Sequence, residues 1–182
     1  MALSPTLWRT CRVLAGKTRL ALYRRIIQSP GQSVSALAGA ERISVGRASQ
    51  ELRRLQARGV VGVRRDGRHA FYYPESDPLV LSAQPILAAM REVCRRLAPS
   101  SDARTARLAR GLAHEKRIAM VRALRQGPMA VHELQARLKM PSQTLWYHLR
   151  FLKTGGWIVP SRRRWKLEPS GHPLAKCLLQ LI

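Results

Sequence analysis

The sequence predicts a mainly α-helical fold with two small β-hairpins, built as two tandem copies of one helix-turn-helix unit. Three observations support this fold class. Residues 14–24 recur as residues 112–122, and colinear matches at nearly the same offset continue along most of the chain. Apolar residues recur at helical spacing, and short extended runs flank turn residues. A repeat of this length indicates duplication of one structural unit.

The stretch over residues 44–59 has the pattern of a recognition helix. The Ser44 hydroxyl can cap the first turn, and Gly59 supplies a left-handed stop after the last one. Between them, Ala48, Leu52 and Leu55 form one narrow apolar stripe, and the opposite face is polar and cationic. The second copy keeps the stripe at equivalent positions, Leu145, Leu149 and Leu152. Taken alone, either segment could equally be a solvated surface helix.

The other segments of the first copy follow in a helix-turn-helix order. Ser4 and Pro5 provide the N-cap and first-turn proline of a first helix. Helices are predicted over residues 17–28 and 33–40, and a turn at 41–43 leads into the recognition helix.

A β-hairpin with a cationic tip is predicted after the recognition helix. Extended runs over residues 60–65 and 68–73 flank a turn at Asp66 and Gly67. We call this hairpin, and its shorter counterpart around residues 162–164, a wing.

The two copies divide the chain into residues 1–98 and residues 99–182. A long helix over residues 78–97 closes the first copy, and a linker over 98–102 follows. Ser101 or Asp102 is expected to cap the first helix of the second copy. The apolar segment 174–182 forms a short last helix, expected to pack on the first copy or on another chain.

The charge balance indicates a polyanionic partner. Lys and Arg number 33 against 10 Asp and Glu, which gives a net charge of +23. Both copies are basic, with 17 cations against 6 acids in residues 1–98 and 16 against 4 in residues 99–182. Cations that neutralise phosphates release counterions, which favours binding to nucleic acid. An anionic membrane fits less well, because the chain shows no basic amphipathic helix with a bulky apolar face.

Several further features bound the location and chemistry of the chain. No segment has the roughly 18 consecutive apolar residues of a membrane span, so we expect a soluble, cytoplasmic, nucleoid-associated protein. Residues 1–40 contain no acid, as in organelle transit peptides, but they belong to the repeat. Cys11, Cys94 and Cys177 are too scattered for a disulfide framework. Cys11 and Cys94 fall on helices expected to pack together, either as a redox pair or as small buried side chains.

Residues 14–74 resemble the ArsR-type winged helix-turn-helix transcriptional regulators. The resemblance rests on Thr18-Arg19-Leu20, Val34, Leu37, residues 49–52, Leu55, Gly59-Val60-Val61, residues 64–68 and Tyr72-Tyr73. The second copy fits the same pattern through Lys116-Arg117-Ile118, Tyr147-His148-Leu149, Leu152 and Gly156.

The resemblance implies a DNA-binding repressor whose units pair through their first and last helices. Here two units are fused, so the chain is expected to form a single-chain pseudo-dimer, and a homodimer with four heads stays open. The metal-binding cysteines and histidines of such sensors have no counterpart in residues 33–40 or 78–97. His69, His114, His132, His148 and His172 match no zinc spacing. We therefore expect no metal and no other cofactor, and the sequence makes no small-molecule effector evident.

The predicted DNA contacts come from both recognition helices and both wings. Arg and Gln side chains can read guanine and adenine in the major groove, and wing arginines are suited to phosphates. The predicted residues of the first copy are Ser44, Arg47, Ser49, Gln50, Arg53, Arg54, Arg64, Arg65 and Arg68. Those of the second copy are Ser142, Gln143, Thr144, Trp146, Tyr147, His148, Arg150, Arg162, Arg163 and Arg164. The resemblance places His148 beside the DNA.

The second recognition helix differs chemically from the first. Trp146, Tyr147 and Phe151 replace polar or charged residues, and they could read thymine methyl groups, stack on sugars or be partly buried. Two unequal heads predict an asymmetric operator with half-sites about one helical turn apart.

Two rival functions belong to other classes. An enzyme is poorly supported, because the chain has no recognisable nucleophile motif or glycine-rich phosphate loop and only 10 acids. A winged-helix architectural or protein-interaction module that binds DNA or RNA nonspecifically is the stronger alternative, because charge alone would support it.

Overall fold

The chain folds as ten α-helices and two small antiparallel sheets over the residues that the computed structural model describes, 6–182. The predicted cap at Ser4 and Pro5 lies outside them. The first half contains α1 (Leu7–Leu14), α2 (Lys17–Gln28), β1 (Gln32–Ser33), α3 (Val34–Ala40), α4 (Val45–Gln56), β2 (Gly62–Asp66), β3 (His69–Tyr73) and α5 (Ala83–Arg96). The second half contains a 3-10 turn (Pro99–Ser101), α6 (Asp102–Gly111), α7 (Glu115–Leu124), α8 (Val131–Leu138), α9 (Ser142–Thr154), β4 (Ile158–Ser161), β5 (Arg164–Leu167) and α10 (Pro173–Gln180).

Local capping signals set the ends of the predicted helices in the first half. The Ser33 hydroxyl accepts a hydrogen bond from the backbone N–H of Ala36 at 3.2 Å. Ser44 accepts from the N–H of Arg47 at 3.3 Å, so α4 begins where its N-cap predicts. Gly59 has a φ of 67° and ends the segment in the left-handed region. The predicted bounds of α2 are confirmed.

The first wing differs from the prediction in two details. Asp66 pairs with His69, so its turn consists of Gly67 and Arg68, one residue later than predicted. Gly67 has a φ of 52°, and glycine at the first central position is typical of a two-residue hairpin turn. The short strand β1, which was not predicted, adds to β3 and makes a sheet of order β1-β3-β2.

The last helix of the first half is shorter than predicted, because α5 begins at Ala83 and not at Pro78. Pro85 explains the difference. Proline lacks a backbone N–H and is tolerated only in the first turn, where α5 places it. The preceding residues form a turn in which the Asp77 carboxylate accepts from the N–H of Leu79 at 2.9 Å.

The predicted cap of the second half is also wrong. Neither Ser101 nor Asp102 makes a side-chain hydrogen bond to the first turn of α6. Ser101 already has a helical backbone, with φ −80° and ψ −7°, because the 3-10 turn continues directly into α6. The carboxylate of Asp102, the first residue of α6, is bound by an arginine of α2.

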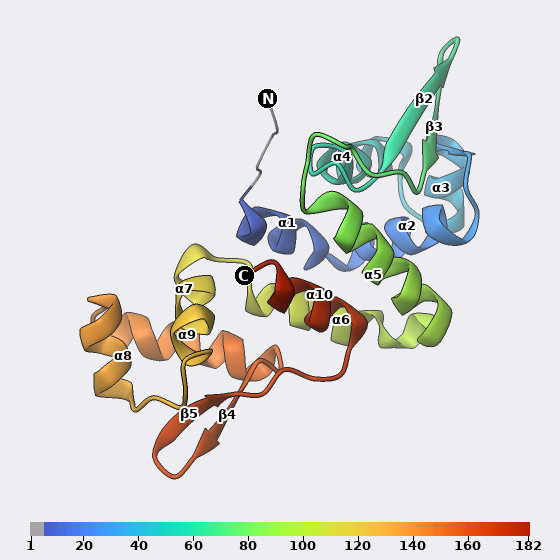
Figure 1. Cartoon of the computed structure of the whole chain (residues 1–182). Helices are drawn as coiled ribbons and strands as arrows, with labels where there is room; N and C mark the ends of the chain where they lie inside the picture. The colour runs from blue at the N-terminus through green and yellow to red at the C-terminus, as the bar shows by residue number, and fades with distance from the viewer. Residues whose placement is uncertain (1–5) are drawn as a thin grey trace.

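The two halves pack through their first and last helices. Helix α1 contacts α6, and α5 contacts α10 (Figure 1). The buried apolar side chains of both halves form one cluster. Leu174 and Leu178 of α10 are fully buried, so the apolar C-terminal segment packs on the first half, one of the two predicted outcomes. The wings lie at opposite ends of the molecule (Figure 1). Within residues 6–182, no helix has the length and apolar character needed to cross a membrane.

A buried ion pair joins α2 of the first half to α6 of the second. The guanidinium of Arg24, 4% exposed, donates to both carboxylate oxygens of Asp102, with Nη2 2.5 Å from Oδ1 and Nε 2.9 Å from Oδ2. Its Nη1 donates to the carbonyl oxygen of Leu97 at 3.1 Å. The hydrogen bond to Asp102 raises the pKa of Arg24 despite its burial. A bidentate pair of this kind fixes orientation as well as distance.

Asp102→Asn tests this connection. The substitution leaves the Arg24 guanidinium buried without its counter-charge, so we expect the free energy of unfolding to fall by about 3 kcal/mol. Chemical denaturation measures the change. The matched control is Glu168→Gln, which removes a carboxylate from an exposed pair with Lys166 and should cost less than about 1 kcal/mol. Equal effects of the two substitutions would show that the buried pair does not hold the halves together.

Candidate nucleic-acid interface

Helix α4 buries its apolar stripe and exposes its cationic face, as predicted. Ala48, Leu52 and Leu55 are all 0% exposed. The opposite face is open to solvent over most predicted contact residues, namely Ser44, Arg47, Gln50, Arg53 and Arg54, with Ser49 partly buried. The helix is therefore held by one side and presents donors on the other.

The fold brings the free face of α4 together with the first wing. A groove of about 410 Å³ runs between them, with Ser49 and Arg53 of α4 and Arg65 and Arg68 of the wing among its lining residues. Four residues that the sequence predicts as contacts thus share one concave surface. Cationic side chains around a groove concentrate positive potential and attract phosphates.

The arginines of this interface fall into two groups. Arg54 pairs with Glu51 at 2.9 Å, and Arg64 pairs with Glu75 at 2.5 Å. In the described part of the chain, no ion pair involves the other predicted contact arginines of this half, Arg47, Arg53, Arg65 and Arg68. Exposed ion pairs contribute less than about 1 kcal/mol, so phosphates can compete even for the paired group.

Helix α9 presents an aromatic face instead of a cationic one. Its stripe of Leu145, Leu149 and Leu152 is buried. Trp146 and Tyr147 are 50% and 59% exposed, which leaves them accessible to a partner. Trp146 also lies edge-on to Trp165 of the second wing, with ring centroids 6.4 Å apart. The polar predicted contacts Ser142, Gln143 and Arg150 are exposed, and Thr144 is partly buried.

His148 does not lie where it was predicted. It is 3% exposed, its Nδ1 atom has no hydrogen-bond partner, and its ring lies 4.6 Å from that of His114. The reason is its position on α9, three residues after Leu145 and four before Leu152, on the inner side of the helix. Burial lowers the pKa of His148 to about 4, and the neighbouring His114 and Arg117 add to this effect. His148 is therefore neutral and enclosed.

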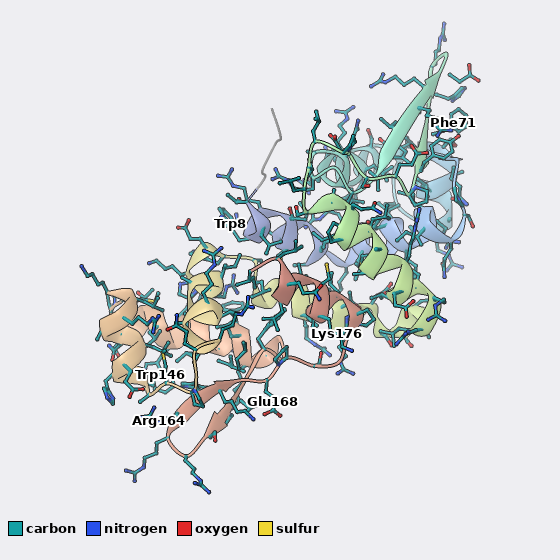
Figure 2. All side chains as sticks on the ribbon, in the orientation of Figure 1. Trp8, Phe71, Trp146, Arg164, Glu168 and Lys176 are labelled. Carbon is teal, nitrogen blue, oxygen red and sulfur yellow. The ribbon has the colours of Figure 1, made fainter. Side chains whose placement is uncertain are left out.

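The second wing has a strained, strongly cationic turn. Arg162 and Arg163 occupy its two central positions with φ values of 47° and 65°, the left-handed region that favours glycine. Both side chains are exposed. Arg164 points back and pairs with Glu133 of α8 at 2.9 Å, and Figure 2 shows it near the tip of the wing. Strained arginines at a tip are consistent with a functional role for their placement.

Sequence reasoning missed an ion pair behind the first recognition helix. Arg19 of α2 donates from Nη1 to Glu51 at 2.6 Å. Burial alone would raise the pKa of Glu51, but Arg19 and Arg54 together hold it below its ordinary value. The aligned halves contained a usable signal, because both carry an arginine at this position, Arg19 and Arg117, whereas the residue at the position of Glu51 in the second half is His148.

Residues 6–182 contain neither a cluster of potential metal ligands nor a disulfide. Over residues 6–182, no three His, Cys, Asp or Glu side chains are grouped to hold a metal ion, and the absence of a metal stays a prediction. All three cysteines are free. Cys11 and Cys177 are buried and Cys94 is partly buried, which agrees with the interpretation as packed side chains.

The geometry defines a helix-turn-helix fold with an outward recognition helix and a hairpin beside it. Comparison with known proteins agrees for the second half, because residues 112–156 match a family model described as a helix-turn-helix domain. This stretch includes α7, α8 and α9. The chain therefore contains a domain of a class that is typical of DNA-binding regulators. No curated protein matches the chain.

A substitution in the second wing separates strain from charge. Arg162→Asn with Arg163→Gly places residues suited to positive φ in the turn, so we expect about 1–2 kcal/mol of added stability. Loss of two cations should at the same time weaken binding to duplex DNA and reduce the salt dependence by up to about two phosphate contacts. Denaturation and salt titrations measure the two effects. The control Arg162→Lys with Arg163→Lys keeps both strain and charge, and an unchanged DNA affinity in the Asn/Gly variant would contradict the role of the wing.

Proposed function

We propose that the chain is a sequence-specific regulator of transcription that binds double-stranded DNA through two tandem winged helix-turn-helix units. The observation that carries the proposal is the shared form of α4 and α9. Each helix buries an apolar stripe of three residues at one face, presents its other face to solvent and lies beside a basic hairpin. A helix displayed in this way fits the major groove, and the hairpin can reach the flanking phosphates.

The element order supports a duplication. In each half, four helices are followed by a hairpin and a last helix. Gly59 and Gly156 both follow the recognition helix with positive φ, at 67° and 72°. A bridge between Met129 and Trp165 stands where β1 pairs with β3 in the first half. These correspondences agree with the matches in sequence.

The contacts between the halves support a single-chain pseudo-dimer. Helix α1 meets α6, and α5 meets α10, so each helix packs against its counterpart in the other copy. Contacts between equivalent surfaces are the signature of a two-fold interface. Two heads are therefore joined without a second chain, and a homodimer would present four.

The resemblance to ArsR-type regulators supports repression as the mode of action and the nucleoid as the place. We assign base contacts to Arg47, Gln50 and Arg53 in the first head and to Tyr147 and Arg150 in the second. The wing arginines bind phosphates in this proposal. The alternative is an architectural module that binds DNA or RNA nonspecifically, which the net charge of +23 would also support.

Selection of binding sites from a random pool of duplex DNA tests the proposal. We expect an enriched asymmetric motif with two unlike half-sites about one helical turn apart, bound at least ~10³-fold more tightly than random duplex. A flat selection would favour the architectural alternative. A perfect palindrome, or protection of only one half-site, would contradict the pairing of two unlike heads.

Substitutions in the two heads should act on different half-sites. Gln50→Ala and Arg53→Ala are expected to relax the preference in one half-site, at about 1–3 kcal/mol for each lost base contact. Tyr147→Ala and Arg150→Ala should relax it in the other. Arg95→Ala is the matched control, because this arginine is exposed on α5, which packs on α2 and α10. Equal loss of affinity in Arg53→Ala, Arg150→Ala and Arg95→Ala, with no loss in Gln50→Ala and Tyr147→Ala, would indicate a general charge effect.

A further inference from the structure

A cluster of cationic and aromatic side chains lies where α1 of the first half approaches α7 and α9 of the second. The ring of Trp8 on α1 stacks on His114, which precedes α7, with centroids 6.4 Å apart. His114 in turn lies 4.6 Å from His148 of α9. The guanidinium of Arg117 on α7 lies over the ring of Phe151, 4.6 Å from its centroid. Figure 2 shows Trp8 on the side of α1 that faces α7.

The central arginine of this cluster has no counter-charge. Arg117 is 7% exposed, and its Nε and Nη1 atoms are buried without a hydrogen-bond partner. Burial lowers its pKa, but an arginine side chain stays charged in proteins. A buried charge without a partner is costly and calls for an explanation.

The neighbouring cations make the site more positive, and the carboxylate of Glu115 offsets part of their effect on His114. Arg12 on α1 lowers the pKa of Arg117, and Lys116 together with Arg117 lowers that of His148. The thiol of Cys11 supplies no negative charge, because burial raises its pKa to about 12. Among the described residues, no carboxylate forms an ion pair with Arg117.

The first half shows which partner Arg117 lacks. Its equivalent arginine, Arg19, donates to Glu51 at 2.6 Å and to the carbonyl oxygen of Val13 at 2.7 Å. The residue at the position of Glu51 in the second half is His148, whose Nδ1 is itself buried and unpartnered. The second copy thus keeps the arginine and replaces its carboxylate with a neutral group that can donate a hydrogen bond.

We propose that Arg117, His148 and His114 form an anion-binding site that takes the oxyanion of a phosphate group. The bound anion occupies the role that the Glu51 carboxylate has in the first half, and it accepts from the unpartnered donors of Arg117 and His148. Tyr147, which is 59% exposed, places its ring 5.3 Å from that of His148, so the cluster lies next to the surface. Charge-assisted hydrogen bonds to an oxyanion are the strong ones in proteins.

The site does not depend on the proposed DNA-binding function, but its position links the two halves. The anion would contact α7 and α9 of the second half beneath α1 of the first. Occupancy therefore joins α9 to α7, and the contact between Trp8 and His114 connects this pair of helices to the first half. The phosphate group belongs either to a free phosphorylated compound or to the DNA backbone.

Thermal unfolding of the full chain in sodium phosphate, against sodium chloride at equal ionic strength and pH 7.5, tests the site. For one site above its dissociation constant, each tenfold rise in phosphate should raise the folding equilibrium constant about tenfold. Arg117→Met should lose this phosphate-specific response. His148→Glu should unfold at a higher temperature without phosphate and lose the response as well, because the new carboxylate pairs with Arg117.

The reciprocal substitution provides the matched control. Glu51→His removes the counter-charge of Arg19 and leaves its hydrogen bond to the Val13 carbonyl, so the variant should be less stable in chloride and respond more strongly to phosphate than the wild type does. Equal phosphate responses in the wild type, Arg117→Met and His148→Glu would overturn the proposal, because they would reflect general binding of anions to a protein of charge +23. The His148→Glu result decides the question if Arg117→Met fails to fold.

Competition identifies the source of the phosphate group. Binding of a random 20-base-pair duplex is measured with and without inorganic phosphate at constant ionic strength. If the site takes a backbone phosphate, inorganic phosphate should weaken DNA binding in the wild type but not in Arg117→Met. If the duplex affinity is unchanged while phosphate still stabilises the wild type, the site serves a free phosphorylated compound.

Discussion

The packing of α1 on α6 and of α5 on α10 is the contact on which the rest of the molecule depends. Each half has roughly 90 residues, near the lower end of domain size, and a domain this small has little core of its own. Sharing one apolar cluster between halves removes this limitation. It also fixes α4 and α9 relative to each other, because α9 packs on α6 and α4 packs on α2, which itself contacts α6. The bidentate contact between Arg24 and Asp102 adds orientation to a packing that apolar contacts alone would define loosely.

The two halves differ at the surface and, unexpectedly, in one place beneath it. Buried leucines hold α4 and α9 in the same way, but the exposed face of α4 is cationic and that of α9 is aromatic. The ion pair between Arg19 and Glu51 has no equivalent in the second half, where Arg117 lies over the ring of Phe151 and a histidine, His148, stands at the position of Glu51. A surface difference changes what a head contacts. A buried difference changes the conditions under which that head is stable, which is why we regard it as the more informative one.

Local signals explain why much of the fold could be predicted from the sequence. The bounds of α2, the N-caps at Ser33 and Ser44 and the left-handed Gly59 depend on neighbours in the chain. The start of α5 could also have been found, because Pro85 forbids a helix that begins seven residues earlier. The strand β1 could not be predicted from local signals, since its two residues pair with β3, which lies far along the chain. The elements of the candidate interface, a helix with a cationic face and a wing, were likewise predicted from the sequence. The groove between them could not be, because it forms only when the wing folds back beside α4.

The error at His148 has a different origin. Its place beside the DNA was carried over from a family resemblance, whereas the helical phase of α9 puts it three residues from one buried leucine and four from another. The equivalent residue, Glu51, is itself charged and largely enclosed, 13% exposed. The polar character of Glu51 and His148 therefore did not reveal that their side chains lie on the buried sides of α4 and α9.

The strained, cationic turn of the second wing and the unpaired Arg117 both lower the stability of the second half in the absence of a bound anion. Two arginines in left-handed conformations, exposed at a hairpin tip, lower the stability of the isolated chain. So does a buried guanidinium without an anion. Both costs fall on the second half, and both would be offset by a phosphate group, at the wing by charge attraction and at Arg117 by direct hydrogen bonds. The second head is thus built to be more stable when phosphate is bound than when the chain is alone, whereas the first head carries its own carboxylate.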